Sequence, residues 1–136
     1  MTEPSLALQG AIVTALTADT ALSTLIAGRV FDRVAPNAAR PYVRYGGDQV
    51  VPDKAECLER SVEIYVTLDV FSDAVGKPEA KRIVGATVDA LDGADLNLGP
   101  GLALCLIEHD GTRYLDDEDT LGTHAVLTFR ALIDAA

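Results

Sequence analysis

The stretch SVEIYVTLDVF, residues 61–71, decides the fold of this protein. Its apolar side chains fall on every second position, which is the spacing of a β-strand with one buried face. The apolar face carries Val62, Ile64, Val66, Leu68 and Val70. The opposite face is mixed, and it carries Ser61, Glu63, Tyr65, Thr67, Asp69 and Phe71. The first face therefore belongs to a core, and the second is either hydrated or part of an interface.

Further strands are predicted on both sides of this one. Residues 124–133 alternate cleanly, and residues 30–34 and 41–45 show the same period over a shorter length. Residues 102–110, LALCLIEHD, are apolar on both faces for most of their length. Such a composition is typical of a central strand, or of a strand that a partner covers.

Three helices are predicted from apolar spacings of three and four. The first covers residues 5–18 with Ser5 as its N-cap, the second runs from Asp19 or Thr20 to Ala27, and the third starts near Pro78. The helices do not alternate with every strand. We therefore predict an α+β fold, in which an antiparallel or mixed β-sheet of about four to five strands has helices packed on one face.

The charge balance is strongly acidic and limits the partners. Eleven Lys and Arg stand against twenty-one Asp and Glu, which gives a net charge of −10. Binding to nucleic acid or to an anionic membrane requires clustered positive charge. Aromatic residues make up only 5% of the chain, which is too few for a protein that stacks bases. The length of 136 residues is that of one domain, which we expect to span residues 1–136.

The cysteines and the first residues indicate the compartment. Cys57 and Cys105 are the two cysteines, and residues 1–10 lack the basic start and the apolar run of a secretion signal. We expect two free thiols and a cytosolic protein.

An enzyme would need a cluster of reactive side chains, and this sequence offers few. Cys105 and His109 are four residues apart on one strand, roughly 13 Å, which is too far for a shared metal ion or a nucleophile and base. No motif of a zinc site, a phosphate-binding loop or a nucleophile elbow is present. We expect no catalytic residue, no metal and no cofactor. The alternative is a small cytosolic α+β enzyme or ligand-binding domain that uses His109, His124 and Arg113.

Four blocks of sequence carry a resemblance to a known family. They are GRVFDRV at residues 28–34, Pro41-Tyr42-Val43 leading to Gly46-Gly47, LDVFS at 68–72 followed by Gly76 and Glu79-Ala80-Lys81, and RYLDDEDTLGTH at 113–124 running into LTFRALI. In this order they resemble the tail-completion, or tail-terminator, proteins of long-tailed bacteriophages and phage-like gene transfer agents. The resemblance extends over nearly the whole chain.

The resemblance implies a structural function. Such proteins form a hexameric ring at the head-proximal end of the tail tube, where they stop tube polymerisation and join the tail to the head connector. The implied partners are further copies of the chain, the tube protein and the connector protein, while DNA passes through the ring without specific binding. The ring is assembled in the host cytoplasm and ends in the tail of the particle. No catalytic residue is implied. A remaining alternative is an acidic adaptor that binds a basic host protein.

Two segments are candidates for contacts in such a ring. Residues 48–59 show no clean period, and we predict an arm that a neighbouring subunit or the tube protein orders through Val50, Val51 and Leu58. The loop acids are the first candidates for the lumen or a ring face, because four successive carboxylates cannot pair with one another. These acids are Asp116, Asp117, Glu118 and Asp119, and weaker candidates on the mixed strand face are Glu63 and Asp69. The simpler interpretation of the acidic loop is a hydrated turn, and its spacing does not match an EF-hand.

Overall fold

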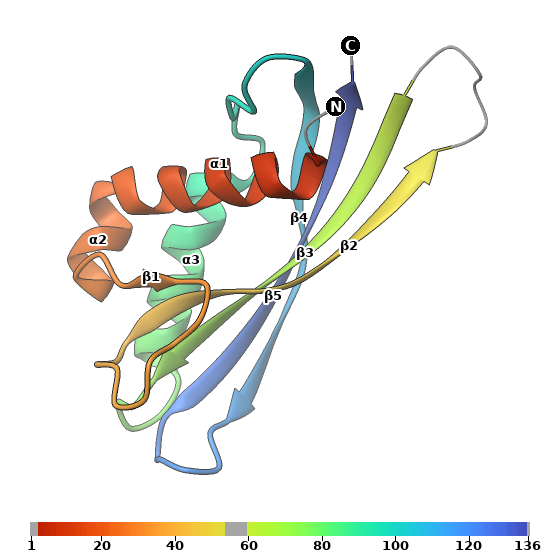
Figure 1. Cartoon of the computed structure of the whole chain (residues 1–136). Helices are drawn as coiled ribbons and strands as arrows, with labels where there is room; N and C mark the ends of the chain where they lie inside the picture. The colour runs from red at the N-terminus through yellow and green to blue at the C-terminus, as the bar shows by residue number, and fades with distance from the viewer. Residues whose placement is uncertain (1–2, 54–59, 136) are drawn as a thin grey trace.

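The computed structural model describes residues 3–53 and 60–135. A five-stranded sheet has the strand order β1-β2-β3-β5-β4, with β1 parallel to β2 and every other neighbouring pair antiparallel. All three helices lie on one face of this sheet (Figure 1). The prediction of an α+β fold with a mixed sheet is thereby confirmed. The elements are α1 (Pro4–Ala18), α2 (Thr20–Ile26), β1 (Val30–Phe31), β2 (Tyr42–Asp53), β3 (Arg60–Ser72), α3 (Pro78–Leu91), β4 (Leu102–Asp116) and β5 (Thr123–Ala135).

The helix boundaries follow from capping residues. At the start of α1 the cap is Glu3, whose carboxylate accepts hydrogen bonds from the backbone N–H groups of Ser5 and Leu6, so the expectation of Ser5 as the N-cap was wrong. Asp19 caps α2 through the N–H of Leu22. No single helix in the described part of the chain could cross a membrane by length and composition, although α1 and α2 together could as a pair bent by 80°.

The core fills the space between the helices and one face of the sheet. The expected inward faces of β3 and β5 are buried, except that Val62 of β3 is only partly buried. Helix α3 packs against both strands, while α1 packs against β2 and α3. The fully buried side chains at the centre of this core include Ile64, Leu68, Ile83, Leu127 and Phe129. The opposite face of the sheet has no helix over it (Figure 1), and we call it the helix-free face.

Two expectations about strands need correction. Residues 102–110 belong to β4, which lies at the edge of the sheet rather than at its centre. Residues 48–53 are not irregular, because they continue β2 and pair with residues 61–66 of β3. Of the predicted arm, Val50 packs against the core and Val51 is exposed on the helix-free face, while Leu58 lies outside the described residues.

A β-bulge explains why the second half of β2 was missed. The pairing with β3 shifts between Tyr45 and Asp48, so the alternation of side chains changes phase at Gly46 and Gly47. The backbone comes very close to β3 here: a Cβ on Gly46 would lie 2.8 Å from the carbonyl oxygen of Thr67 and 2.8 Å from a carboxylate oxygen of Asp69. Gly46 is therefore required by close approach of the backbone, whereas Gly47 has open space around it.

The two adjacent glycines make a matched test of the bulge. Gly46→Ala should lower the free energy of unfolding by about 1–3 kcal/mol, because the added methyl group forces the two strands apart. Gly47→Ala should change it by less than about 0.5 kcal/mol. Urea denaturation of both variants measures the difference, and equal stabilities would contradict the close approach at Gly46.

Candidate functional site

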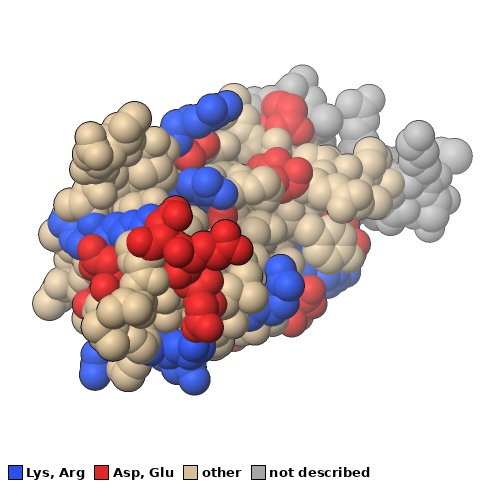
Figure 2. Space-filling view, turned by 90° about the horizontal axis from the view of Figure 1, so that it is seen from below, with Lys and Arg blue, Asp and Glu red and all other residues tan. Residues whose placement is uncertain are grey.

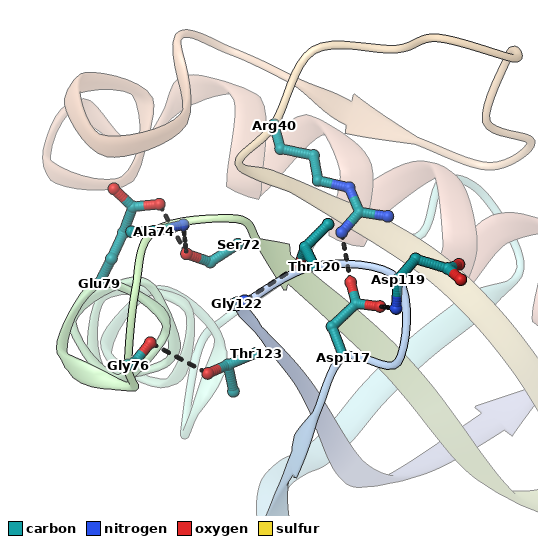
Figure 3. A network of polar contacts seen from close by, with 10 residues as sticks. All are labelled: Arg40, Ser72, Ala74, Gly76, Glu79, Asp117, Asp119, Thr120, Gly122 and Thr123. Atoms are coloured by element: carbon teal, nitrogen blue, oxygen red, sulfur yellow. Dashed lines mark hydrogen bonds and ion pairs between the residues drawn. The ribbon is translucent and has the colours of Figure 1, made fainter.

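Two loops are fastened together at the end of the sheet that faces away from the chain termini (Figures 1 and 3). One connects β3 to α3, and the other connects β4 to β5. The N–H of Gly76 donates to the carbonyl oxygen of Leu121 at 3.3 Å, and the hydroxyl of Thr123 donates to the carbonyl oxygen of Gly76 at 3.1 Å. At the start of the first loop, the Ser72 hydroxyl donates to Glu79 at 2.8 Å and accepts from the N–H of Ala74.

Gly122 brings the two loops into direct contact. A Cβ at this position would lie 1.8 Å from the carbonyl oxygen of Ser72 and 2.6 Å from the Cα of Asp73. No side chain fits there, so the β4–β5 loop can pack against the end of β3 only with glycine at this position. The tips of the two loops carry Val75 and Leu121, both of which are highly exposed. The loop end of the sheet thus presents two apolar side chains on loops that hydrogen bonds hold together.

The acidic loop divides into paired and unpaired carboxylates. Asp117 is the most enclosed, with 9% of its side chain exposed, and it pairs with Arg40 and accepts the N–H of Asp119 at 3.0 Å. The hydrogen bond from the Asp119 backbone, followed by the one from Arg40, holds the pKa of Asp117 below its usual value. Asp116 pairs with Lys77 at 2.8 Å, which lowers the pKa of Asp116 in the same way. Glu118 and Asp119 are exposed and form no ion pair within the described part of the chain.

These pairings were not predictable from the sequence. Arg40 and Lys77 are 77 and 39 residues away from their partners, and nothing in the local pattern of either points to the acidic loop. Viewed from this end, the acidic side chains gather in the middle and basic ones flank them (Figure 2). Only part of the loop charge is therefore available to a partner.

The two candidate acids on β3 also lie in ion pairs. Asp69 has 7% of its side chain exposed and receives hydrogen bonds from Arg44 at 2.9 Å and from the ring of His124 at 2.8 Å. Glu63 accepts from Arg130 at 2.7 Å and from the hydroxyl of Tyr65 at 2.5 Å, and these two bonds lower its pKa, the bond from Tyr65 most strongly. Asp69 in particular does not present a free negative charge to solvent.

An aromatic row crosses the helix-free face near the loop end. Ring centroids are 5.5 Å apart between Phe31 and Tyr42, 5.2 Å between Tyr42 and Phe71, and 4.3 Å between Phe71 and His124. The guanidinium of Arg40 lies 5.2 Å from the Phe71 ring. The sequence did not reveal this row because its members come from four different strands, and only the register of the sheet brings them side by side.

The candidate residues for an enzyme are not brought together. His109 of β4 lies opposite Phe129 of β5 and is hydrogen-bonded to Thr112. His124 of β5 lies opposite Leu115 of β4 and is hydrogen-bonded to Asp69. The two histidines are therefore separated by six positions along β4, which is about 20 Å. Cys105 is an exposed free thiol next to Asp134, and the hydrogen bond to that carboxylate raises its pKa. Among residues 3–53 and 60–135 no three His, Cys, Asp or Glu side chains could hold a metal ion.

Comparisons with known proteins identify the family of this chain. The family model of the tail completion protein gp17 matches residues 10–134, so the chain belongs to this family of structural tail proteins. A solved structure described as the virion of a native gene transfer agent particle contains a chain that is 29% identical, with a TM-score of 0.89. The match covers 99% of this chain and 100% of that one. No curated protein matches the sequence.

The pairing of Asp117 predicts a pH dependence of stability. A carboxyl group with a lowered pKa stabilises the folded state above its unfolded pKa of about 3.9, and this contribution is lost as the pH falls through the folded pKa. Asp117→Asn should therefore lower the free energy of unfolding at neutral pH by about 1–3 kcal/mol and flatten its decline below about pH 4. Thermal denaturation over a pH series measures both effects.

The neighbouring Glu118→Gln variant is the control for this series, because Glu118 is exposed and unpaired among the described residues. It should change stability by less than about 0.5 kcal/mol. If both variants behaved alike, Asp117 would not be the anchor of the loop.

Proposed function

We propose that this chain forms a ring, most simply a hexamer, at the head-proximal end of a tail tube. The ring ends polymerisation of the tube and joins it to the head connector, and DNA passes through its centre. The observation that carries the proposal is the family match over residues 10–134, together with the full-length similarity to a chain of a gene transfer agent virion. The partners of the ring are the tube protein and the connector, and it is assembled in the host cytoplasm before it becomes part of the particle.

The arrangement of charged groups supports a structural function. Charged side chains on the helix-free face and at the loop end are held in ion pairs. Arg44 is paired with Asp69, and Arg130 lies between Glu63 and Glu108. Such pairs fix side chains in place rather than holding them ready to react. We accordingly propose no catalytic role, no cofactor and no membrane for this chain.

The net charge supports passage of DNA. At −10 for each copy, six copies would carry about −60, so a phosphate backbone would be repelled from most surfaces of the ring. At the loop end and on the helix-free face, Arg40, Arg44, Lys77 and Arg130 each lie within reach of a carboxylate, which partly neutralises them. Arg113 is exposed on the same face and forms no ion pair among the described residues. We propose Glu118 and Asp119 as the acids that face the lumen or a ring surface, with Asp116 and Asp117 serving to hold their loop.

Loss of the protein tests the proposed function directly. A strain that lacks the gene should produce heads and tails that do not join, and its tail tubes should vary in length because nothing stops their growth. Electron micrographs of lysates measure both features, and expression of the wild-type chain should restore them. Joined particles with tails of normal length in the deletion strain would contradict the proposal.

Charge reversal at the loop tip tests the placement of the acids. Glu118→Lys combined with Asp119→Lys leaves the anchor Asp117 intact and should retain DNA at the joint, so that delivery of DNA per assembled particle falls by about tenfold. The matched control is Glu118→Gln with Asp119→Asn, which removes charge without adding cations and should deliver DNA at close to the wild-type level. Normal delivery by correctly assembled double-Lys particles would exclude the lumen for this loop.

A further inference from the structure

The two edges of the sheet are open over short stretches. At one edge β1 covers β2 only at Val43 and Arg44, and no other backbone hydrogen bond among the described residues reaches the outer side of residues 48–53. At the other edge the turn after α3 covers the middle of β4, where Ile107 accepts the N–H of Gly93 at 2.8 Å and the N–H of His109 donates to Asp92 at 2.9 Å. No contact of this kind reaches residues 102–106 within the described part of the chain.

The open stretches lie at the same level of the sheet. Val51 is opposite Glu63, Glu63 is opposite Leu132, and Leu132 is opposite Leu106. A single row across four strands thus connects the free part of β2 to the free part of β4. Both are at the end of the sheet where the two chain termini lie (Figure 1).

Residues 49–52 and 102–106 are uncharged in a chain that is strongly acidic, although Asp48 and Asp53 flank the first of these two segments. They read QVVP at residues 49–52 and LALCL at residues 102–106. Edge strands of soluble proteins are usually protected by charged side chains, proline or a β-bulge. Residues 102–106 carry no charge and no proline, and the pairing with β5 shifts between Leu104 and Leu106. Val51 and Leu106 are each 38% exposed on the helix-free face. Because Pro52 cannot donate a hydrogen bond, an added strand would bond mainly to residues 49–51 of β2.

The strand directions make the two edges complementary. The four long strands alternate in direction across the order β2-β3-β5-β4, so β2 and β4 are antiparallel to each other. Rotation of a second copy about an axis roughly along the strands would place its β2 beside β4 of the first copy in antiparallel orientation. This contact joins two different surfaces, and repeating it closes a ring when the rotation divides a full turn.

We propose that residues 49–51 of one copy add as an antiparallel strand to residues 102–106 of the next copy. The occupant of the β4 edge is a second copy because its own free edge matches in level, direction and absence of charge. Pairing of β4 with β4 would be two-fold symmetric and would stop at a dimer. The inference rests on the proposed function for the existence of a ring, and it adds the surface through which neighbouring copies recognise each other.

A disulfide cross-link tests the contact in assembled particles. Cys105 is already present on the helix-free side of β4, as its contact with Asp134 at 3.2 Å indicates. Val51 lies level with Leu106, and Cys105 is the extra residue of the β-bulge between Leu104 and Leu106, so it stands at nearly the same level. Residues opposed in antiparallel strands have Cα atoms within disulfide reach. With Cys57→Ser in the background, Val51→Cys should give a ladder of cross-linked copies on a non-reducing gel after mild oxidation. Neither Val51→Cys with Cys105→Ser nor Val50→Cys, which faces the core, should give that ladder.

Charged substitutions at the edge provide a second readout. Ala103→Lys with Cys105→Lys changes two exposed positions and should leave the melting temperature of the subunit unchanged, while incorporation into particles falls by about tenfold or more. Leu115→Lys is the control, since it adds one positive charge to an exposed position of β4 outside the proposed contact, and it should be incorporated normally.

The possible outcomes distinguish a failure of the proposed edge contact from a failure of the proposed ring. Particles with several copies of the chain per tail, no cross-linked ladder and normal incorporation of the double-Lys variant would overturn the edge contact and leave the ring in place. A single copy per tail would overturn the ring itself. A ladder that depends on both cysteines, together with loss of the double-Lys variant from particles, would support the proposal.

Discussion

Coverage of the sheet by helices on only one side is the constraint on which the rest of this structure depends. The alternation in residues 61–71 places one face of β3 in a dry core and leaves the other face without a helix. That helix-free face has to be compatible with water or with a partner. Many of its charged groups are therefore arranged in pairs, such as Asp69 with Arg44 and His124, and its aromatic rings pack against one another. The same constraint leaves the outer edges of β2 and β4 as surfaces on which an assembly can be built.

The loop end of the sheet shows how a surface can be both charged and rigid. Gly122 allows the β4–β5 loop to touch the end of β3, and Asp117 fastens that loop to Arg40. Two of the four successive acids are used in this way, and Glu118 and Asp119 remain exposed on a fixed support. In the ring that we propose, a rigid acidic surface suits a joint that has to hold its neighbours and let DNA pass.

Periodicity was sufficient to predict the fold class, because residues 61–71 and 124–133 each have one apolar face and the helices have clear boundaries. It failed where the period is interrupted: the bulge at Gly46 and Gly47 hid the second half of β2. It also failed for β4, where apolar side chains on both faces indicated a central strand although the strand is at an edge. Here the alternative interpretation, that a partner covers the strand, is the one that the edge position favours.

The candidate site was less accessible to sequence reasoning than the fold. The loop acids were recognised as a group, but their division into anchors and exposed charges depends on Arg40 and Lys77, which only the tertiary structure brings near. Burial of Asp69 likewise depends on residues from β2 and β5. Charge runs are visible in a sequence, whereas the partners that neutralise them are not.

The most direct test of the account is a reconstruction of the assembled particle in which this chain is located. The account predicts a closed ring of copies between the tail tube and the head connector, with the DNA path through its centre and with β2 of each copy next to β4 of its neighbour. A chain found as a single copy, or on the outside of the tail away from the head, would contradict it.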